Sequence, residues 1–157
     1  MNRIERQIDF GYIFDPTHKG APYSFDGVHW LNNGEFLEPC TKWLFGYEMK
    51  KDANTPFDKG SDIPEINASV KSSKATLTSV KLGSTFEEIK RNYFERVHST
   101  LWIYATMIED KIVVYLMNKD EFAEFMDCFG TYCTDRQVIR FKSTSGKMIK
   151  WFEERVA

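Results

Sequence analysis

The chain has 157 residues, of which 42% are hydrophobic and 28% charged, and its formal net charge is −2. A chain of this length forms one domain that buries roughly two-thirds of its unfolded surface. No apolar run approaches the roughly 20 residues of a membrane-spanning helix. The start, MNRIERQIDFGYIF, carries charges where a secretory signal needs an apolar segment. We therefore expect one cytoplasmic domain over residues 1–157, without a membrane partner.

The cysteines and histidines offer no evident nucleophile or metal site. The three cysteines are an odd number without CxxC spacing, and the three histidines are scattered along the chain. This pattern argues against a disulfide framework and against a zinc site. We expect the cysteines to be buried free thiols.

The basic residues gather in two stretches. Residues 66–86 contain three lysines and no acid, and residues 136–152 contain five basic residues and no acid. A solvated charged face is the plain alternative for each stretch alone. As phosphate contacts, the candidates are Lys74, Lys81, Arg91, Arg136, Arg140, Lys142, Lys147 and Lys150.

The first half of the chain predicts a loop, a helix, a strand and a second helix. Residues 15–33 are dense in Pro, Gly, Asp and Asn, so we expect 1–33 to be an N-terminal arm or loop before a core over 34–157. Asn33 predicts the cap of a helix over residues 34–45. A tight turn or short strand at 62–65 then precedes a strand over 66–77. Ser84 and Glu87 have capping-box spacing and predict a helix to about residue 97.

The second half predicts a hairpin, a helix, a strand and a final helix. TLWIYATM and KIVVYLMN are apolar strands joined at Glu109-Asp110. Asn118 predicts the cap of a helix to residue 125, VIRFK predicts a last strand, and SGKMIKWFEERV a closing helix. This order predicts an α/β or α+β protein with a mixed central sheet flanked by helices.

The stretch DIPEINASVK, residues 62–71, carries the clearest chemical pattern. Carboxylates at the end of one strand and the start of the next can hold Mg²⁺, which polarises a phosphoryl oxygen and acidifies a water. A lysine beside them can position or deprotonate that water. Strand periodicity puts Ser69 and Lys71 on one face, and a turn can bring Asp62 back beside Ser69. These three residues are the candidate catalytic residues.

DIPEINASVKS resembles the D-x(6)-E-x-K signature of the MutH-like branch of the PD-(D/E)xK nucleases, which includes type II restriction endonucleases. GEFLEPCTKWLFG is similar to the acid-bearing helix of that family, and RVHSTLWIYA to its helix end and following strand. The resemblance spans residues 34–107, under half of the chain. It implies a restriction-endonuclease-like fold, Mg²⁺ as cofactor with Mn²⁺ as a substitute, and double-stranded DNA as partner.

The resemblance also implies roles for single residues. Asp62 becomes a metal ligand, Lys71 the catalytic lysine, and Glu35, ahead of Glu38, an auxiliary acid from the first helix. Ser69 departs from the family, which has a carboxylate at this position.

Some family members with an S-x-K motif take the missing acid from the next helix. Glu87 and Glu88 stand there in this sequence and are candidate metal ligands, although Glu87 has helix capping as its alternative role. Glu65 ranks below them, because four strand residues place it roughly 13 Å from position 69.

These observations lead to three functional hypotheses. The first is a Mg²⁺-dependent DNA endonuclease of restriction or nicking type, as a homodimer if it cuts both strands and with a cognate methyltransferase if it is a restriction enzyme. The second is a catalytically silent, nuclease-derived DNA-binding or regulatory protein. The third is a protein-interaction module with no nucleic-acid role, in which the aromatic content of 15% is only core. The plain alternative for the motif stretch itself is a surface strand.

Overall fold

A four-stranded mixed sheet forms the centre of the molecule. The computed structural model describes residues 1–7, 34–47, 61–72, 77, 81–142 and 145–156. The strand order is β1-β4-β3-β2, with antiparallel β1–β4 and β4–β3 pairs and a parallel β2–β3 pair. The strands are β1 (Asn2–Gln7), β2 (Ala68–Lys71), β3 (Leu101–Ile108) and β4 (Lys111–Met117). The expected mixed α/β class is confirmed.

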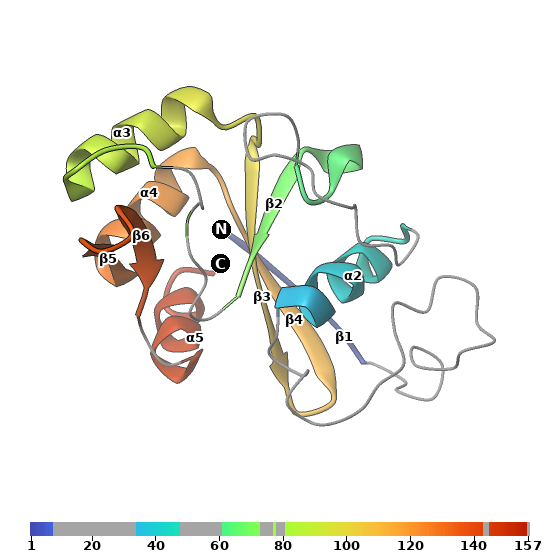
Figure 1. Ribbon diagram of the computed structural model, residues 1–157. Coiled ribbons are helices and arrows are strands. Elements are labelled where there is room, and N and C mark those ends of the chain that lie inside the picture. Colours follow the sequence, from blue (N-terminus) through green and yellow to red (C-terminus); the bar gives the residue numbers. More distant parts are fainter. Residues whose placement is uncertain (8–33, 48–60, 73–76, 78–80, 143–144, 157) are drawn as a thin grey trace.

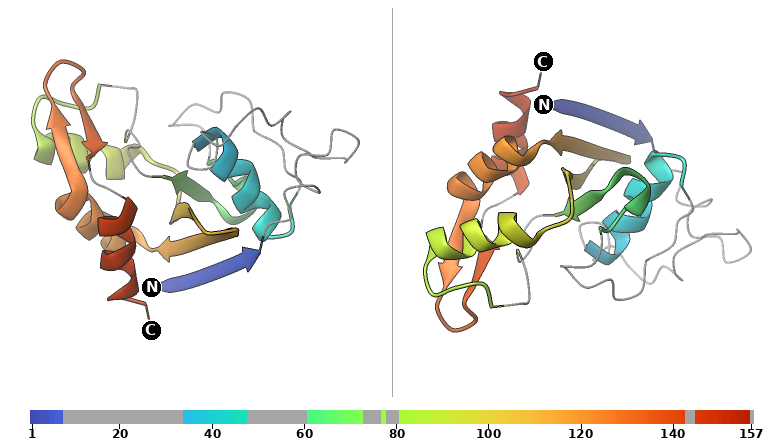
Figure 2. Two further views of the ribbon diagram at one scale, coloured as in Figure 1. Left: turned by 90° about the horizontal axis from the view of Figure 1, so that it is seen from below. Right: turned by 90° about the horizontal axis from the view of Figure 1, so that it is seen from above.

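Helices cover both faces of this sheet (Figure 1; Figure 2). Helix α2 (Gly34–Leu44) lies on one face. The other face carries a layer of three helices and a separate two-stranded sheet. That layer consists of α3 (Phe86–Arg96), α4 (Lys119–Phe129), β5 (Gly130–Cys133), β6 (Val138–Phe141) and α5 (Ser145–Glu153). None of the helices in the described ranges is long and apolar enough to cross a membrane.

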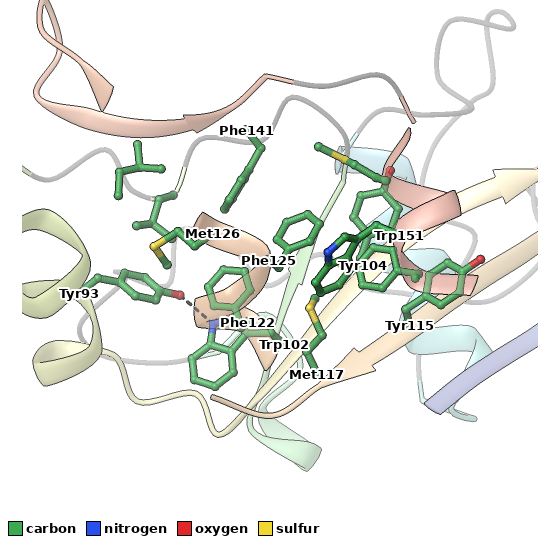
Figure 3. Close-up of a cluster of buried hydrophobic side chains, with 14 of the residues drawn as sticks. Tyr93, Trp102, Tyr104, Tyr115, Met117, Phe122, Phe125, Met126, Phe141 and Trp151 are labelled. Atoms are coloured by element: carbon green, nitrogen blue, oxygen red, sulfur yellow. Dashed lines mark hydrogen bonds between the residues drawn. The ribbon is translucent and has the colours of Figure 1, made fainter. Parts of the chain in front are cut away.

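Each face of the sheet has its own hydrophobic cluster, because successive strand side chains point to opposite faces. On the α2 side, aliphatic residues such as Leu37, Ile63 and Ile103 pack together. The opposite cluster, which we call the aromatic core, combines many aromatic rings with aliphatic and methionine side chains (Figure 3). Within it, the Phe125 ring lies 5.0–6.2 Å from six other rings, those of Tyr104, Phe122, Phe129, Phe141, Trp151 and Phe152.

All three cysteines are free thiols, as expected, but one of them is not buried. Cys40 and Cys133 are buried, and burial raises the pKa of the Cys40 thiol to about 12. Cys128 is exposed on α4. The expectation of burial was therefore wrong for Cys128.

Strand β1 corrects the expectation of an N-terminal arm or loop for residues 2–7, and residues 8–33 lie outside the described ranges. It is an edge strand of the central sheet, paired with β4 from Asn2–Leu116 to Gln7–Lys111. Its sequence, NRIERQ, contains one large apolar residue and is mostly exposed, so it shows no strand alternation. Pairing and an ion pair from Arg3 Nε to Glu153 Oε1 at 2.8 Å hold it in place.

The strand expected over residues 66–77 is shorter in the structure. Residues Pro64–Ile66 form a 3₁₀ turn, and Asn67 has a left-handed backbone with φ of 50°. Leu77 lies in the aromatic core, and its N–H donates to the Ile139 carbonyl at 2.8 Å. Residues 73–76 and 78–80 lie outside the described ranges.

The helix starts and ends differ by a few residues from the expectation. Thr85, not Ser84, caps α3, since its hydroxyl accepts the Glu88 N–H at 3.2 Å. Asn118 caps α4 through a complete capping box with Glu121, but the helix runs on to Phe129. Strand β5, which follows directly, was not predicted and pairs with β6.

Candidate functional site

Asp62 closes the free edge of strand β2. An edge strand leaves alternate backbone N–H groups without a neighbouring strand. Here the chain folds back through the 3₁₀ turn, so that Ala68 N–H donates to the Ile63 carbonyl at 3.1 Å. The next outward group, Val70 N–H, donates to Asp62 Oδ2 at 2.7 Å. The carboxylate therefore takes the place of a strand partner.

The same carboxylate oxygen is hydrogen-bonded to Ser69. Ser69 Oγ lies 3.3 Å from Asp62 Oδ2, and Ser69 is 7% exposed. The expectation that a turn brings Asp62 back beside position 69 is confirmed. Oδ2 thus accepts from a backbone amide and a hydroxyl, while no described residue donates to Oδ1.

Ser69 and Lys71 share the face of β2 that looks toward α3. In the parallel pairing Ser69 stands beside Trp102 and Lys71 beside Tyr104, both of which belong to the aromatic core. Val70 packs against the cluster on the α2 side, as expected. In the described part of the chain, no carboxylate forms an ion pair with Lys71.

Tyr93 of α3 reaches the same place from the facing helix. It is 1% exposed, and its hydroxyl accepts the Trp102 indole N–H at 2.9 Å (Figure 3). Burial raises the Tyr93 pKa, while the Lys71 charge and the hydrogen bonds to Trp102 and Ser69 act in the opposite direction. Tyr93 was predicted only to face inward, and its position beside Ser69 depends on how α3 packs.

The two helix glutamates proposed as metal ligands are Glu87 and Glu88 of α3. Glu87 and Glu88 lie in the first turn of α3, roughly 8 Å along the helix axis from Tyr93. Glu87 is exposed, and the Glu88 side chain lies directly against Gly83. Among the described residues, no group of three or more His, Cys, Asp or Glu side chains is placed to hold a metal.

The remaining candidate acids are Glu35, Glu38 and Glu65. The side chain of Glu35 lies outside what the structure describes, and Glu38 is half-buried on α2, which covers the opposite face of the sheet from Ser69. Glu65 is exposed within the 3₁₀ turn. Asp62 is thus the carboxylate that the described structure places beside Ser69.

Asp62 is the carboxylate that the described residues offer to a Mg²⁺ ion beside Ser69. Mg²⁺ in proteins is usually bound through one or two carboxylates together with waters and substrate phosphates. Asp62 supplies one carboxylate, whose Oδ2 accepts from Val70 and Ser69 and whose Oδ1 accepts from no described residue. A serine hydroxyl adds no charge, so a phosphate would have to complete the site.

The candidate phosphate contacts are spread over several elements. Arg91 lines a depression of about 380 Å³ together with acids, lysines and Phe94. Lys74 lies outside the described residues. Arg140 on β6 is half-buried, and the other candidates are exposed: Lys81, Arg136, Lys142, Lys147 and Lys150.

Comparisons with known proteins do not assign the chain to a family. A scan against protein-family models finds no match, and searches of curated proteins and of solved structures find no significant match. The fold and site therefore define a mixed α/β protein with an acid, a hydroxyl and a lysine at one edge of its sheet.

Proposed function

We propose that the protein is a metal-dependent DNA endonuclease whose centre is formed by Asp62, Ser69 and Lys71. The observation that carries the proposal is the 3.3 Å approach of Ser69 Oγ to Asp62 Oδ2. It places the acid beside the strand on which Lys71 follows two residues later, on the same face. The resemblance of residues 34–107 to PD-(D/E)xK nucleases is the second support.

Each residue has a distinct role in this proposal. Asp62 holds the cation through Oδ1, and Glu35 is the auxiliary acid. Bound Mg²⁺ would lower the pKa of a water and neutralise charge on the phosphate. Lys71 orients the attacking water and stabilises the charge that develops on the phosphoryl group.

DNA contacts complete the proposal. The exposed basic residues beside β6 and on α5 would lie along the phosphate backbone, where contacts set affinity rather than sequence. A homodimer would be required to cut both strands, and a restriction enzyme would act beside a cognate methyltransferase. Binding through such contacts weakens steeply as salt rises.

The proposal is tested by cleavage of supercoiled plasmid and unmethylated phage DNA with Mg²⁺, Mn²⁺ or EDTA. Metal-dependent nicking or linearisation is expected for the wild type, and loss of at least about 100-fold for Lys71→Ala, which removes a charge aimed at the transition state. Lys111→Ala, a lysine on β4 paired with Glu5, is the matched control. Equal cleavage by Lys71→Ala, or cleavage that persists in EDTA, would contradict the proposal.

A second candidate is a DNA-binding protein without catalysis. It is favoured by the use of Asp62 as a strand-edge cap and by the lack of a three-acid group among the described residues. Gel-shift titration at several salt concentrations separates the two. Salt-dependent binding by wild type and by Lys71→Ala, with no cutting by either, would support the silent protein.

A further inference from the structure

Strand β1 is a free edge of the central sheet in the described part of the structure. It is the outermost strand in the order β1-β4-β3-β2 and pairs there with β4 alone. Figure 2 shows it at the margin of the molecule. In an antiparallel pair, alternate residues direct their N–H and C=O groups away from the partner strand. No described residue outside β4 is hydrogen-bonded to the backbone of β1.

The opposite edge of the sheet is closed by the chain itself. At β2, the Ile63 carbonyl and the Asp62 carboxylate accept the outward N–H groups of Ala68 and Val70. The described residues supply no such closure at β1. An edge with unpaired backbone groups is a template for pairing with a strand of another chain.

The side chains of β1 differ between its two faces. Arg3 and Glu5 share the face that carries α5, with which Arg3 forms an ion pair at 2.8 Å. Ile4 and Arg6 share the face that carries α2, where the Arg6 guanidinium lies 3.9 Å from the centre of the Trp43 ring. Ile4 is 37% exposed and is the one large hydrophobic side chain that is exposed among the described residues. The edge therefore presents an apolar side chain between charged ones.

The sequence of β1, NRIERQ, is complementary to itself in one antiparallel register. A two-fold axis at Ile4 places Arg3 opposite Glu5 of the second copy and Ile4 opposite its own copy. Opposite charges and apolar side chains that face each other across two strands stabilise the pair. The charges of the edge therefore favour a second copy of the same strand.

Neighbouring registers lack this complementarity. An axis at Arg3 or at Glu5 brings that residue opposite itself, and an axis between Ile4 and Glu5 brings Arg3 opposite Arg6. Like charges directly opposite each other destabilise a strand pair. An axis between Arg3 and Ile4 pairs Arg3 with Ile4 and leaves both Arg3 and Glu5 without an opposite charge across the interface.

We infer that the protein forms a two-fold homodimer through β1, in which the two edge strands pair antiparallel about Ile4. The two sheets join into one sheet of eight strands, with β2 at both outer margins. Arg3 keeps its ion pairs with Glu5 and Glu153 of its own chain, because a guanidinium has five N–H donors. This interface rests on β1 and does not depend on DNA cleavage.

Analytical ultracentrifugation over a range of protein concentrations tests the dimer with Ile4→Lys. The position is exposed in the single chain, so the fold tolerates a lysine there, but two lysines meet at the axis of the dimer. We expect a dimer for the wild type and a dissociation constant raised about 10-fold or more for Ile4→Lys, because like charges brought together oppose association. Thr131→Lys, at an exposed position on β5 of the other sheet, is the matched control and should dimerise like the wild type.

Disulfide cross-linking tests the register and does not depend on how Ile4→Lys folds. The background is Cys128→Ser, since Cys128 is the exposed one of the three cysteines. With oxidised glutathione, Ile4→Cys is expected to give a covalent dimer, because directly opposite residues have the Cα separation of about 4.4–6.8 Å that a disulfide needs. Arg6→Cys faces Asn2 of the second copy, so it should remain a monomer on a denaturing gel, whereas a mixture of Arg6→Cys and Asn2→Cys proteins should cross-link.

The outcomes separate the interface from the enzymatic proposal. A wild type that stays monomeric at every concentration, a dimer that folded Ile4→Lys leaves equally stable, or the absence of cross-linking in Ile4→Cys would overturn the interface. Equal cross-linking by Arg6→Cys alone would overturn the register about Ile4. A dimer with the expected properties that never cuts DNA would uphold the interface and overturn the endonuclease, whereas DNA cleavage by a protein that stays monomeric would do the reverse.

Discussion

Ser69 occupies the position where the resembled nucleases have a carboxylate, and its surroundings explain why a neutral hydroxyl is stable there. The side chain is almost buried and lies against the Asp62 carboxylate on one side and the Tyr93 hydroxyl on the other. A second carboxylate at this position would face the first at close range in a poorly solvated site, where like charges repel strongly. A hydroxyl can instead donate to Asp62 without adding a charge.

Ser69→Glu tests this view at the level of one residue. Without metal, the added buried charge is expected to destabilise the fold by roughly 2 kcal/mol or more. Excess Mg²⁺ should recover much of that loss, because two carboxylates would then share a cation. The measurement is the thermal unfolding midpoint in EDTA and in Mg²⁺. Ser69→Gln, of equal size and no charge, is the control, and an equal Mg²⁺ effect on both variants would argue against a cation site here.

Among the elements, β2 and α3 define the site together. β2 is only four residues long and lies at the edge of the sheet, so its outward backbone donors are closed by residues 62–63. Helix α3 connects β2 to β3 in the chain. Its Tyr93 side chain lies beside β2 and accepts a hydrogen bond from Trp102 of β3. A change that shifts the start of α3 is therefore expected to alter the position of Tyr93 at the site.

The start of α3 can be tested with two adjacent residues. Thr85→Ala removes the hydroxyl that accepts the Glu88 N–H, and we expect a loss of about 1 kcal/mol, or about 2–4 °C in the unfolding midpoint for a chain of this size. Ser84→Ala is expected to change stability by less than about 0.5 kcal/mol. Chemical denaturation of both variants gives the comparison, and a larger loss for Ser84→Ala would place the cap one residue earlier.

At the scale of the whole molecule, a polar contact fastens the central sheet to the last helix. The Tyr115 hydroxyl of β4 and the Arg3 guanidinium of β1 both donate to Glu153 Oε1 of α5. Burial and the Glu153 carboxylate raise the pKa of Tyr115 to about 12. The neutral phenol is therefore the form that the folded protein stabilises.

This contact predicts a stability that falls at high pH. A tyrosine ionises near pH 10 in the unfolded chain and near 12 in the fold, so its contribution is complete below pH 10 and is lost as pH rises toward 12. Tyr115→Phe should cost about 1 kcal/mol at neutral pH and progressively less above pH 10. Unfolding midpoints of both proteins between pH 7 and the alkaline limit measure this. A difference that stays constant across that range would exclude the linkage.

The sequence by itself determined the elements that have strong local signals. The β3–β4 hairpin and the Asn118 cap follow from apolar alternation and capping chemistry, which act between near neighbours in the chain. The return of Asp62 to position 69 also followed from a short turn. Such features form with few contacts to the rest of the molecule.

Tertiary structure alone decided the rest. Strand β1 has no apolar alternation and forms because β4 offers an open edge. Tyr93 comes close to Ser69 because the packing of α3 on the aromatic core sets which of its turns meets β2. Residues 24 apart in the chain meet only through that packing, and local sequence patterns carry no information about distances of this kind.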